Sequence, residues 1–394
     1  MLDASKAFDR VNYCKLVRLL LINRLPPIII RLLLQMYLFN FAQVAWNGTL
    51  STQFRVSNGV RQGAILSPVL FCIYFDVLLG KLSSNGDGCY IGLFFVGALA
   101  YADDLVLLAP SASAMRSMLN TCDAYAIQYN VLFNAKKSKC IRCQPIGAAK
   151  YFSRLTFSPS FYIGSNYIEF VDKWPHLGHI ITNDCDDFED IQAKKCSFIG
   201  QVNKILCTFS NVDSLTKTKL VKSYCTSFYG AEIWDQSNTG IEYICTAWRK
   251  GIRRIWQVPL TTHSALIPGM CDTLPLTDLF YKRMLNFVYR CFKSESSLVR
   301  FIVRHGTLFG EMDSIIGRNV LNCASRYNTS IDRISKLEFC PFSIDKHVRS
   351  GYKNSDITDL LSELLQCRDG TLRLSDSNFS FSDVLAMIDI LCTR

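Results

Sequence analysis

The chain has 394 residues, 49% of them hydrophobic and 19% charged, so it can form two or three domains with buried cores and is too apolar to be disordered. Its formal net charge of +10 fits a polyanionic partner. The surplus is uneven: residues 1–182 hold 17 Lys and Arg against 9 Asp and Glu, whereas the remaining 26 basic and 24 acidic residues nearly cancel.

The first residues, Met1 to Lys6, lack the apolar core of a secretory leader. We therefore expect an intracellular protein of the nucleus and cytoplasm, with its 17 cysteines reduced. The longest apolar stretch, residues 16–36, is interrupted by arginines and prolines, which favours buried helices and no membrane partner. Cys140 and Cys143 have the spacing of half a zinc site, but no second pair follows, which favours buried free thiols over zinc.

In chain order, periodicity and turn residues first predict two helices in residues 12–38 split at Pro26-Pro27, then a hairpin at 41–56 around Asn47-Gly48. A loop at 57–63, a helix at 68–82 and a turn at 85–88 follow. Next come strands at 90–95, 98–101 and 105–109, a helix from Ser111 or Ser113 to Tyr129, and a strand at 139–143. After about residue 185 the pattern changes to helices rich in Lys and Trp, with a break at 237–240. Beyond about residue 300 the signal is weak, with a turn at 369–370 and a last helix at 382–392.

Two adjacent acids, Asp103 and Asp104, lie between two apolar segments that both read as strand, so we expect them at a hairpin tip. Burying two like charges side by side is costly unless a cation neutralises them. A solvent-exposed turn would also tolerate an Asp pair, although such turns usually carry Gly or Asn and this one has neither. Asp3, taken alone, would be an ordinary helix cap. These residues by themselves leave a metal site and an exposed turn both open.

Three segments together resemble the catalytic motifs of reverse transcriptases: residues 2–9 (LDASKAFD), residues 58–68 (NGVRQGAILSP) and residues 101–104 (YADD). Each match is weak alone, but three in order at workable separations are a specific signal. Further segments are similar to later parts of the same enzymes, namely residues 134–139, 177–178 and 229–234. The residues of these motifs are most similar to those in enzymes of non-LTR (LINE-type) retrotransposons.

This resemblance implies an α+β fold: a reverse-transcriptase palm, an antiparallel sheet backed by helices, over residues 1–182. A helical thumb-like region would follow at 183–300, and a C-terminal region of unknown role at 301–394. The implied activity is RNA-directed DNA polymerisation, in which two Mg²⁺ ions, or Mn²⁺ as an alternative, promote transfer of a dNTP to a primer 3′-hydroxyl. The implied partners are an RNA template, a DNA primer, dNTP and other parts of the retrotransposon polyprotein.

The resemblance also implies a metal-binding set. Asp3, Asp103 and Asp104 would hold the ions together with the backbone carbonyl of Ala4, because hard oxygen ligands suit Mg²⁺. Lys137 would donate a proton to the departing pyrophosphate. Asp3, Asp103, Asp104 and Lys137 are thus the predicted catalytic residues.

A second implied set would bind the nucleotide and the primer. Phe8 would exclude a 2′-hydroxyl, Gln62 and Gly63 would lie beside the incoming nucleotide, and Arg61 would contact phosphate. Phe8 is equally compatible with a plain place in the core, and Arg61 with a solvated surface. Leu177 and Gly178 would form the core of the primer grip, although the preceding His176 stands where the family commonly has Tyr.

The chain also departs from the family pattern at its start. A fingers segment precedes the first motif in the family, whereas Asp3 is the third residue here, so we expect a fragment that lacks the fingers. Such a fragment would bind primer–template but polymerise poorly alone. The alternative is an inactive retroelement remnant that only binds nucleic acid. Lys-rich helices and the basic segment Trp248 to Trp256 could hold the template–primer duplex by phosphate contacts. Those helices could equally be solvated faces around core tryptophans.

Overall fold

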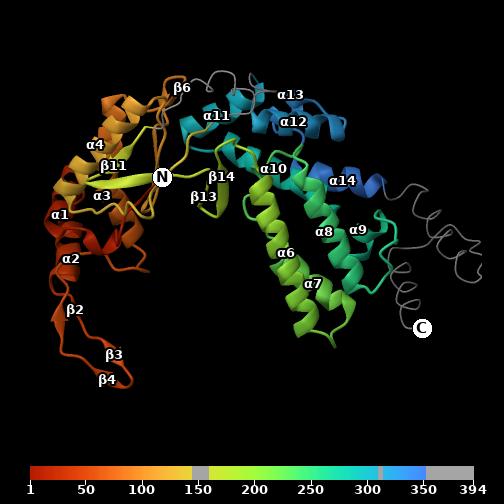
Figure 1. Ribbon diagram of the computed structural model, residues 1–394, viewed down its shortest axis with the longest axis horizontal. Coiled ribbons are helices and arrows are strands. Elements are labelled where there is room, and N and C mark those ends of the chain that lie inside the picture. The colour runs from red at the N-terminus through yellow and green to blue at the C-terminus, as the bar shows by residue number, and fades with distance from the viewer. Residues whose placement is uncertain (144–158, 309–313, 352–394) are drawn as a thin grey trace, which may run out of the picture. The chain divides into compact units, whose positions relative to one another are not determined.

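A computed structural model describes residues 1–143, 159–308 and 314–351 (Figure 1). It divides into two compact units, residues 1–174 and residues 175–394. The first unit combines short strands with helices, and the described part of the second is almost entirely helical, so the predicted α+β class is confirmed. The division at residues 182 and 300 stays a prediction, and the turn and helix predicted after residue 368 lie outside the described residues.

The helices of the first unit begin and end where the sequence places capping residues and prolines. Asn12 accepts a hydrogen bond from the Lys15 amide at 3.1 Å, and Ser111 accepts one from the Ala114 amide at 3.2 Å. The predicted split at Pro26-Pro27 is confirmed, and of the two caps predicted, Ser111 and Ser113, the structure uses Ser111. The helices are η1 (Phe8–Arg10), α1 (Tyr13–Ile22), α2 (Pro27–Leu38), α3 (Ser67–Asn85) and α4 (Ala112–Tyr129).

Three antiparallel strands form the sheet that carries the acidic motifs. The strand order is β1 (Leu2–Asp3), β9 (Asp104–Leu107) and β8 (Ala98–Tyr101). The single strand predicted at 90–95 is wrong, because the chain reverses at Gly92, whose φ of 60° is left-handed. That segment is instead a hairpin of β6 (Tyr90–Ile91) and β7 (Phe94–Phe95).

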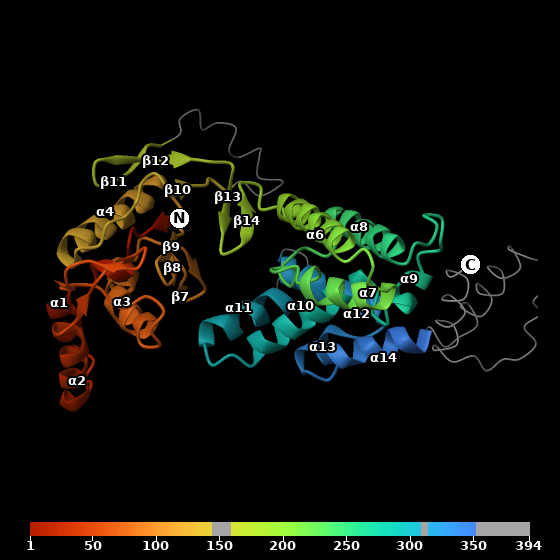
Figure 2. The same cartoon turned by 90° about the horizontal axis from the view of Figure 1, so that it is seen from below.

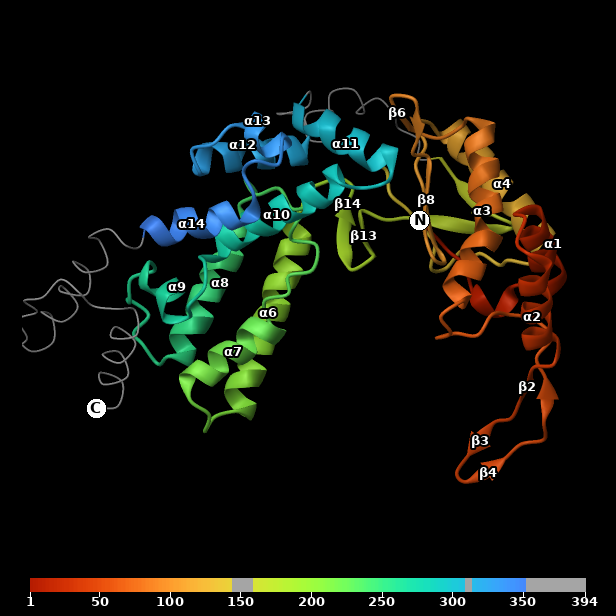
Figure 3. The ribbon, with the colours of Figure 1, turned by 180° about the vertical axis from the view of Figure 1, so that it is seen from behind.

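A β arm projects from the end of α2, away from the rest of the first unit (Figures 1 and 3). It consists of two ladders, β2 (Phe41–Ala42) with β5 (Phe54–Arg55), and β3 (Ala45–Trp46) with β4 (Thr49–Leu50). Asn47 and Gly48, at φ values of 48° and 80°, form its tip. Two consecutive positive φ values are typical of a type I′ turn, so the predicted Asn-Gly hairpin is confirmed. We call residues 39–56 the β2–β5 arm.

A second small sheet packs on α4. Its order is β10 (Lys139–Cys140), β12 (Asn166–Phe170) and β11 (Phe161–Ile163), with β10 parallel to β12, and Figure 2 shows β11 and β12 beside α4. The Gly164 amide, in the turn between β11 and β12, donates to both carboxylate oxygens of Asp123 on α4 at 2.8 Å. This contact fixes the second sheet to the helix layer.

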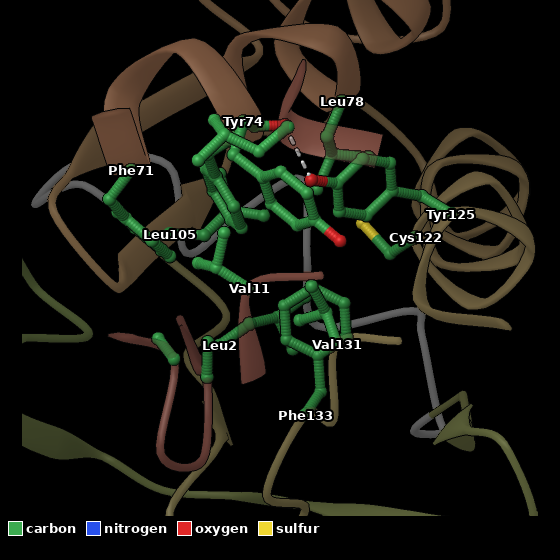
Figure 4. Close-up of a cluster of buried hydrophobic side chains, with 14 of the residues drawn as sticks. Leu2, Val11, Phe71, Tyr74, Leu78, Leu105, Cys122, Tyr125, Val131 and Phe133 are labelled. Carbon is green, nitrogen blue, oxygen red and sulfur yellow. Dashed lines mark hydrogen bonds between the residues drawn. The ribbon is translucent and has the colours of Figure 1, made fainter. Parts of the chain in front are cut away.

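The core of the first unit lies between the β1-β9-β8 sheet and helices α1, α3 and α4 (Figure 4). Tyr74 and Tyr125 are fully buried, and the Tyr125 hydroxyl donates to the Tyr74 carbonyl at 2.7 Å, so a buried polar group is satisfied. Helix α3 is long and apolar enough to cross a membrane, and it is the one described helix that meets this test. Because α3 supplies Phe71, Tyr74 and Leu78 to this core, its apolar composition is explained by packing.

The second unit begins at a hairpin, β13 (Lys173–His176) and β14 (His179–Thr182), which straddles the division at residue 174. Two cores follow, one around Trp234 and one around Tyr281 and Tyr327. Its helices are α6 (Phe188–Thr208), α7 (Ser214–Tyr224), α8 (Gly240–Ile255), α9 (Leu266–Met270), α10 (Leu276–Phe292), α11 (Ser297–Leu308), α12 (Ile315–Arg326), α13 (Ile331–Ser335) and α14 (Pro341–Gly351). The start of α8 at Gly240 confirms the predicted break.

Side chains from the basic helices take part in this packing. Trp248 and Trp256 are buried, and buried Lys217 donates to the Ser210 carbonyl at 2.9 Å. The interpretation of these tryptophans as core residues is therefore confirmed. Lys217 lies on neither a solvated face nor a free basic surface, because it is buried and bonded to the backbone.

The cysteines that the structure describes are free thiols. Burial raises the pKa of the half-buried Cys140 thiol. Cys143 is exposed, so the expectation of a buried thiol is wrong there, because β10 ends at Cys140 and the chain leaves the sheet.

Candidate active site

Asp103 and Asp104 lie at the tip of the β8–β9 hairpin, as their apolar flanks predict. Tyr101 pairs with Asp104, so Ala102 and Asp103 form a two-residue turn. Ala102 has a φ of 52°, an uncommon conformation for a residue with a Cβ. The turn is therefore strained, as turns at functional sites often are.

Asp3 reaches this tip from the other edge of the sheet. In the antiparallel pairing of β1 with β9, Asp3 stands opposite Asp104 and Leu2 stands opposite Leu105. The Ala4 amide donates to the Asp103 carbonyl at 3.4 Å. Leu2 and Leu105 are buried on the core face, so Asp3 and Asp104 project from the opposite face. The fold thus brings Asp3 beside Asp103 and Asp104, which follow it by about a hundred residues in sequence.

The donor chemistry of these acids fits a hard divalent cation, since carboxylate oxygens are the ligands that Mg²⁺ prefers. All three residues are half-buried. In the described ranges, no three His, Cys, Asp or Glu side chains converge closely enough to hold a metal ion. The structure therefore places the three acids side by side on adjacent strands, but their side chains do not converge around one ion position.

The loop at 131–138, which precedes β10, holds β1 in place. The Asp3 amide donates to the Ser138 hydroxyl at 3.1 Å, and the Asn134 amide donates to the Asp3 carbonyl at 2.8 Å. Lys137 is exposed and directly precedes buried Ser138, so the structure places it in the loop bonded to Asp3. The sequence analysis included Asn134 and Ser138 in the same motif but gave a role to Lys137 alone.

The middle motif lies against η1. The Gly59 amide donates to the Val11 carbonyl at 2.9 Å, and the Val60 amide donates to the Phe8 carbonyl at 2.8 Å. Gly59 has a φ of 90°, and a Cβ there would lie 2.8 Å from the Asp9 Cα, so only glycine allows this approach. Sequence reasoning gave Gly59 no role of its own.

The predicted nucleotide residues share this region but differ in their contacts. Phe8 is half-buried and stacks on Phe71, with ring centroids 4.9 Å apart. Gln62 donates to the Asp9 carboxylate at 3.3 Å, and Gly63 has a left-handed φ of 82°. Arg61 is exposed and donates to the Asn40 side chain at 2.6 Å. Phe8 therefore has a core contact, and the predicted nucleotide roles stay predictions.

Leu177 and Gly178 form the turn of the β13–β14 hairpin, in the second unit. Their φ values are 47° and 77°, which is strained at the leucine. A Cβ on Gly178 would lie 3.2 Å from the Tyr229 ring, so the glycine lets that ring pack against the turn. The predicted primer-grip residues are thus the two central residues of one tight turn.

A buried charged network fastens this hairpin to α6, and sequence reasoning missed it. Nδ1 of His179 lies 2.9 Å from Oδ2 of Asp190, and Nε2 lies 3.4 Å from Oδ1 of Asp187. The Nδ1 contact is an ion pair without hydrogen-bond alignment. Fully buried Asp190 also accepts from the Trp234 indole at 2.8 Å and the Ile180 amide at 3.0 Å, and Lys194 pairs with its Oδ1 at 3.2 Å.

The charges of this network stabilise one another. Burial alone would lower the pKa of His179, but the Asp187 and Asp190 carboxylates raise it to about 9. Burial alone would raise the pKa of Asp190, but His179, Trp234 and the Ile180 amide lower it to about 2. Both groups are therefore charged at neutral pH.

Comparison with known proteins agrees with this geometry. Residues 1–202, half of the chain, match the reverse transcriptase (RNA-dependent DNA polymerase) family, so the chain belongs to that family. Its relatives include the Retrovirus-related Pol polyproteins of R2 retrotransposable elements. That of Nasonia vitripennis is 30% identical over 181 residues, which are 45% of this chain and 18% of the relative.

The R2DM relative of Drosophila melanogaster is 30% identical over 200 residues, 49% of this chain and 19% of the relative. The RNA-directed DNA polymerase from mobile element jockey of Drosophila funebris is 23% identical over 270 residues, 66% of this chain and 28% of the relative. The matches thus span less than a third of each relative's length. The predicted resemblance to non-LTR retrotransposon enzymes is confirmed.

Proposed function

We propose that the chain is part of an RNA-directed DNA polymerase that extends a primer 3′-hydroxyl with dNTP along an RNA template. The observation that carries this proposal is the pairing of β1 with β9, which sets Asp3 opposite Asp104 and beside Asp103. Membership in the reverse transcriptase family supports it. In this proposal the first unit contains the palm, the helices after residue 182 act as a thumb, and Leu177 and Gly178 grip the primer.

Asp3, Asp103, Asp104 and the Ala4 carbonyl would hold Mg²⁺, with Mn²⁺ as an alternative. Such ions would supply activation of the primer hydroxyl and neutralisation of the leaving pyrophosphate. The chain's own contribution is positional, because the Ser138 and Asn134 contacts fix β1 and the strained turn at Ala102 presents Asp103. Lys137, in the same loop, would supply a proton.

The biological setting follows the relatives' names, which describe Pol polyproteins of retrotransposable elements. We therefore propose that the natural partners are an RNA template, a DNA primer, dNTP and the other parts of such a polyprotein. The place of action would be the nucleus and cytoplasm.

RNA-templated primer extension with Mg²⁺ tests the proposal. Two proteins should be compared: this chain, and this chain joined to the preceding segment of the R2 relative from Nasonia vitripennis. We expect both to bind primer–template and the joined protein to synthesise DNA. Binding by both without synthesis by either would instead favour the nucleic-acid-binding remnant.

Replacing Phe8 with valine is expected to let the joined protein incorporate rNTP, because the ring that would collide with a 2′-hydroxyl is removed. Phe71→Leu is the matched control, since it loosens the same ring stack from α3 without opening the nucleotide side. The measurement is the ratio of dNTP to rNTP incorporation in primer extension. Equal ratios in the wild type and Phe8→Val, or an equal change in the control, would leave Phe8 as a core residue only.

A further inference from the structure

Helix α2 has two apolar faces, and one of them is exposed in the described structure. On the inner face, Ile30, Leu33 and Tyr37 recur at helical spacing and are buried in the core of the first unit. The outer face carries four large apolar side chains, which are 43–70% exposed and lie within about 100° of one another on the helix: Ile28, Ile29, Leu32 and Met36. We call these four residues the α2 stripe.

The composition of α2 is that of a helix buried on all sides. Among its twelve residues only Arg31 and Gln35 carry charged or amide side chains, and a helix that is apolar all round is normally enclosed. Its main neighbour among the described elements is α1, and Figure 2 shows the two helices packed side by side. The α2 stripe is therefore a contiguous apolar surface of the kind that marks a site of interaction.

Positive charge borders this stripe. Arg31 lies one turn after Ile28 and is exposed, and exposed Arg24 lies just before the first turn of α2. Neither arginine forms an ion pair with a carboxylate in the described part of the chain. Residues 10–75 contain seven Lys and Arg and no Asp or Glu, whereas an average chain of that length would carry about eight acids. The surface around the stripe thus lacks acids of its own that could neutralise these arginines.

We propose that the α2 stripe binds an amphipathic helix of a partner protein, with apolar side chains on one face of that helix and Asp or Glu along its edges. Helices commonly dock through apolar side chains spaced three, four and seven residues apart, which is the spacing of the stripe. Acids along the edges of the partner helix would pair with Arg24 and Arg31. This complementarity of charge favours an acidic helix over a basic one.

Two other occupants fit this surface less well. A second copy of this chain would contact the stripe about a two-fold axis, and an axis near Leu32 would bring the Arg31 side chains of both copies together. A helix that lies in a membrane surface relies on several basic residues along its polar face. The face of α2 opposite the stripe is instead buried in the core, and the helix carries one arginine.

The proposed binding needs neither metal nor polymerisation, so it can be measured in EDTA and its outcome is independent of the proposed polymerase function. Fluorescence anisotropy would follow the full chain added to three labelled helical peptides. The first peptide has leucine at every third or fourth position with glutamate on both sides. The second replaces each glutamate by lysine, and the third replaces each leucine by serine. We expect the first peptide to bind at least about tenfold more tightly than the other two.

Leu32→Ser is expected to weaken binding of the glutamate peptide by about ten- to a hundredfold, as the loss of one buried leucine contact predicts. Leu32→Met should keep most of the affinity, because methionine fills a similar apolar volume. Arg31→Glu should make the lysine peptide the tighter ligand. Ile127→Ser is the matched control, because Ile127 is an exposed apolar residue on α4 of the same unit, outside the stripe. It should bind as the wild type does.

Wild-type affinity in Leu32→Ser, or equal affinity of the wild type for the glutamate and lysine peptides, would overturn the proposal. Displacement of the glutamate peptide by excess primer–template would assign its binding to a nucleic-acid surface. Effects of Leu32→Ser confined to self-association or to anionic phospholipid vesicles would assign the stripe to a second copy or to a membrane. Loss of peptide binding in the protein joined to the preceding segment of the R2 relative would show that this segment covers the stripe.

Thermal unfolding of each variant checks that the fold is retained. Retention is expected for the substitutions at Leu32, because this side chain is 58% exposed and is not part of the core of the first unit. A loss of affinity without a loss of thermal stability is therefore the result that supports the proposal.

Discussion

Asp103→Asn is expected to abolish RNA-templated DNA synthesis by the protein joined to its preceding segment, while leaving binding of primer–template intact. Asp103 occupies the turn of the β8–β9 hairpin, and asparagine has nearly the same size and shape, so the turn should be retained. A metal-bound carboxylate helps to supply several kcal/mol of charge stabilisation in the transition state. At about 1.4 kcal/mol for each tenfold change in rate, a loss of about a thousandfold or more is expected.

The measurement is the rate of single-nucleotide extension, with primer–template affinity measured separately. Asp76→Asn is the matched control, because Asp76 is an exposed acid on α3 of the same unit and the substitution removes the same charge. It should extend primers at the wild-type rate. Normal extension by Asp103→Asn would exclude Asp103 from the metal site. An equal loss of extension rate in Asp76→Asn would show that the change in net charge, and not the position of Asp103, causes the loss.

Asp190→Asn is expected to destabilise the second unit by about 3–5 kcal/mol, the usual cost of leaving a buried ion pair with one uncompensated partner. Asp190 is fully buried and joins His179, Lys194 and the Trp234 indole. Equilibrium unfolding in urea measures the loss. The control is Asp332→Asn, since Asp332 pairs with Lys336 on the surface and should contribute less than about 1 kcal/mol. Equal stability of Asp190→Asn and wild type would show that the network is not fastening the hairpin.

The same network makes stability depend on pH. Because the folded pKa of His179 is raised from 6.5 to about 9, its contribution is complete below pH 6.5 and is lost as the pH rises through 9. The folded pKa of Asp190 is lowered from 3.8 to about 2, so its contribution is present above pH 3.8 and is lost as the pH falls through 2. The unfolding midpoint should therefore decrease as the pH rises from 6.5 through about 9, and His179→Gln should remove that decrease. A persistent decrease in His179→Gln would assign it to another group.

Local structure could be predicted from the sequence wherever one or two residues determine the backbone conformation. Pro26-Pro27, Asn47-Gly48 and Ser111 mark element boundaries that the structure shares. Gly92 was overlooked inside an apolar run, so a hairpin was taken for one strand. Beyond residue 300 the helices before residue 351 were not predicted, although the buried residues Val320, Cys323 and Ala324 of α12 recur at helical spacing.

The candidate site, by contrast, could not be predicted from local sequence alone. The apolar flanks of Asp103 and Asp104 predict a hairpin tip, but nothing local predicts that β1 pairs with β9, and resemblance alone suggested it. The His179 network was missed because its members contribute single polar residues that form no motif. Such contacts arise from tertiary packing, which local periodicity does not encode.

The pairing of β1 with β9 also has a consequence for how the protein is made. About a hundred residues separate the two strands, so at about 5–20 residues per second the ribosome delivers β9 roughly 5–20 s after β1. During that interval β1 lacks β9, its ladder partner among the described strands, and residues 131–138, which also bond to Asp3, emerge later still. Asp3 in the nascent chain therefore lacks these hydrogen-bond partners until α4 has been synthesised. Contacts between residues so far apart in sequence form slowly. Slowing translation between β1 and β9 would lengthen the period in which β1, with Leu2 not yet buried, is open to chaperones or to aggregation.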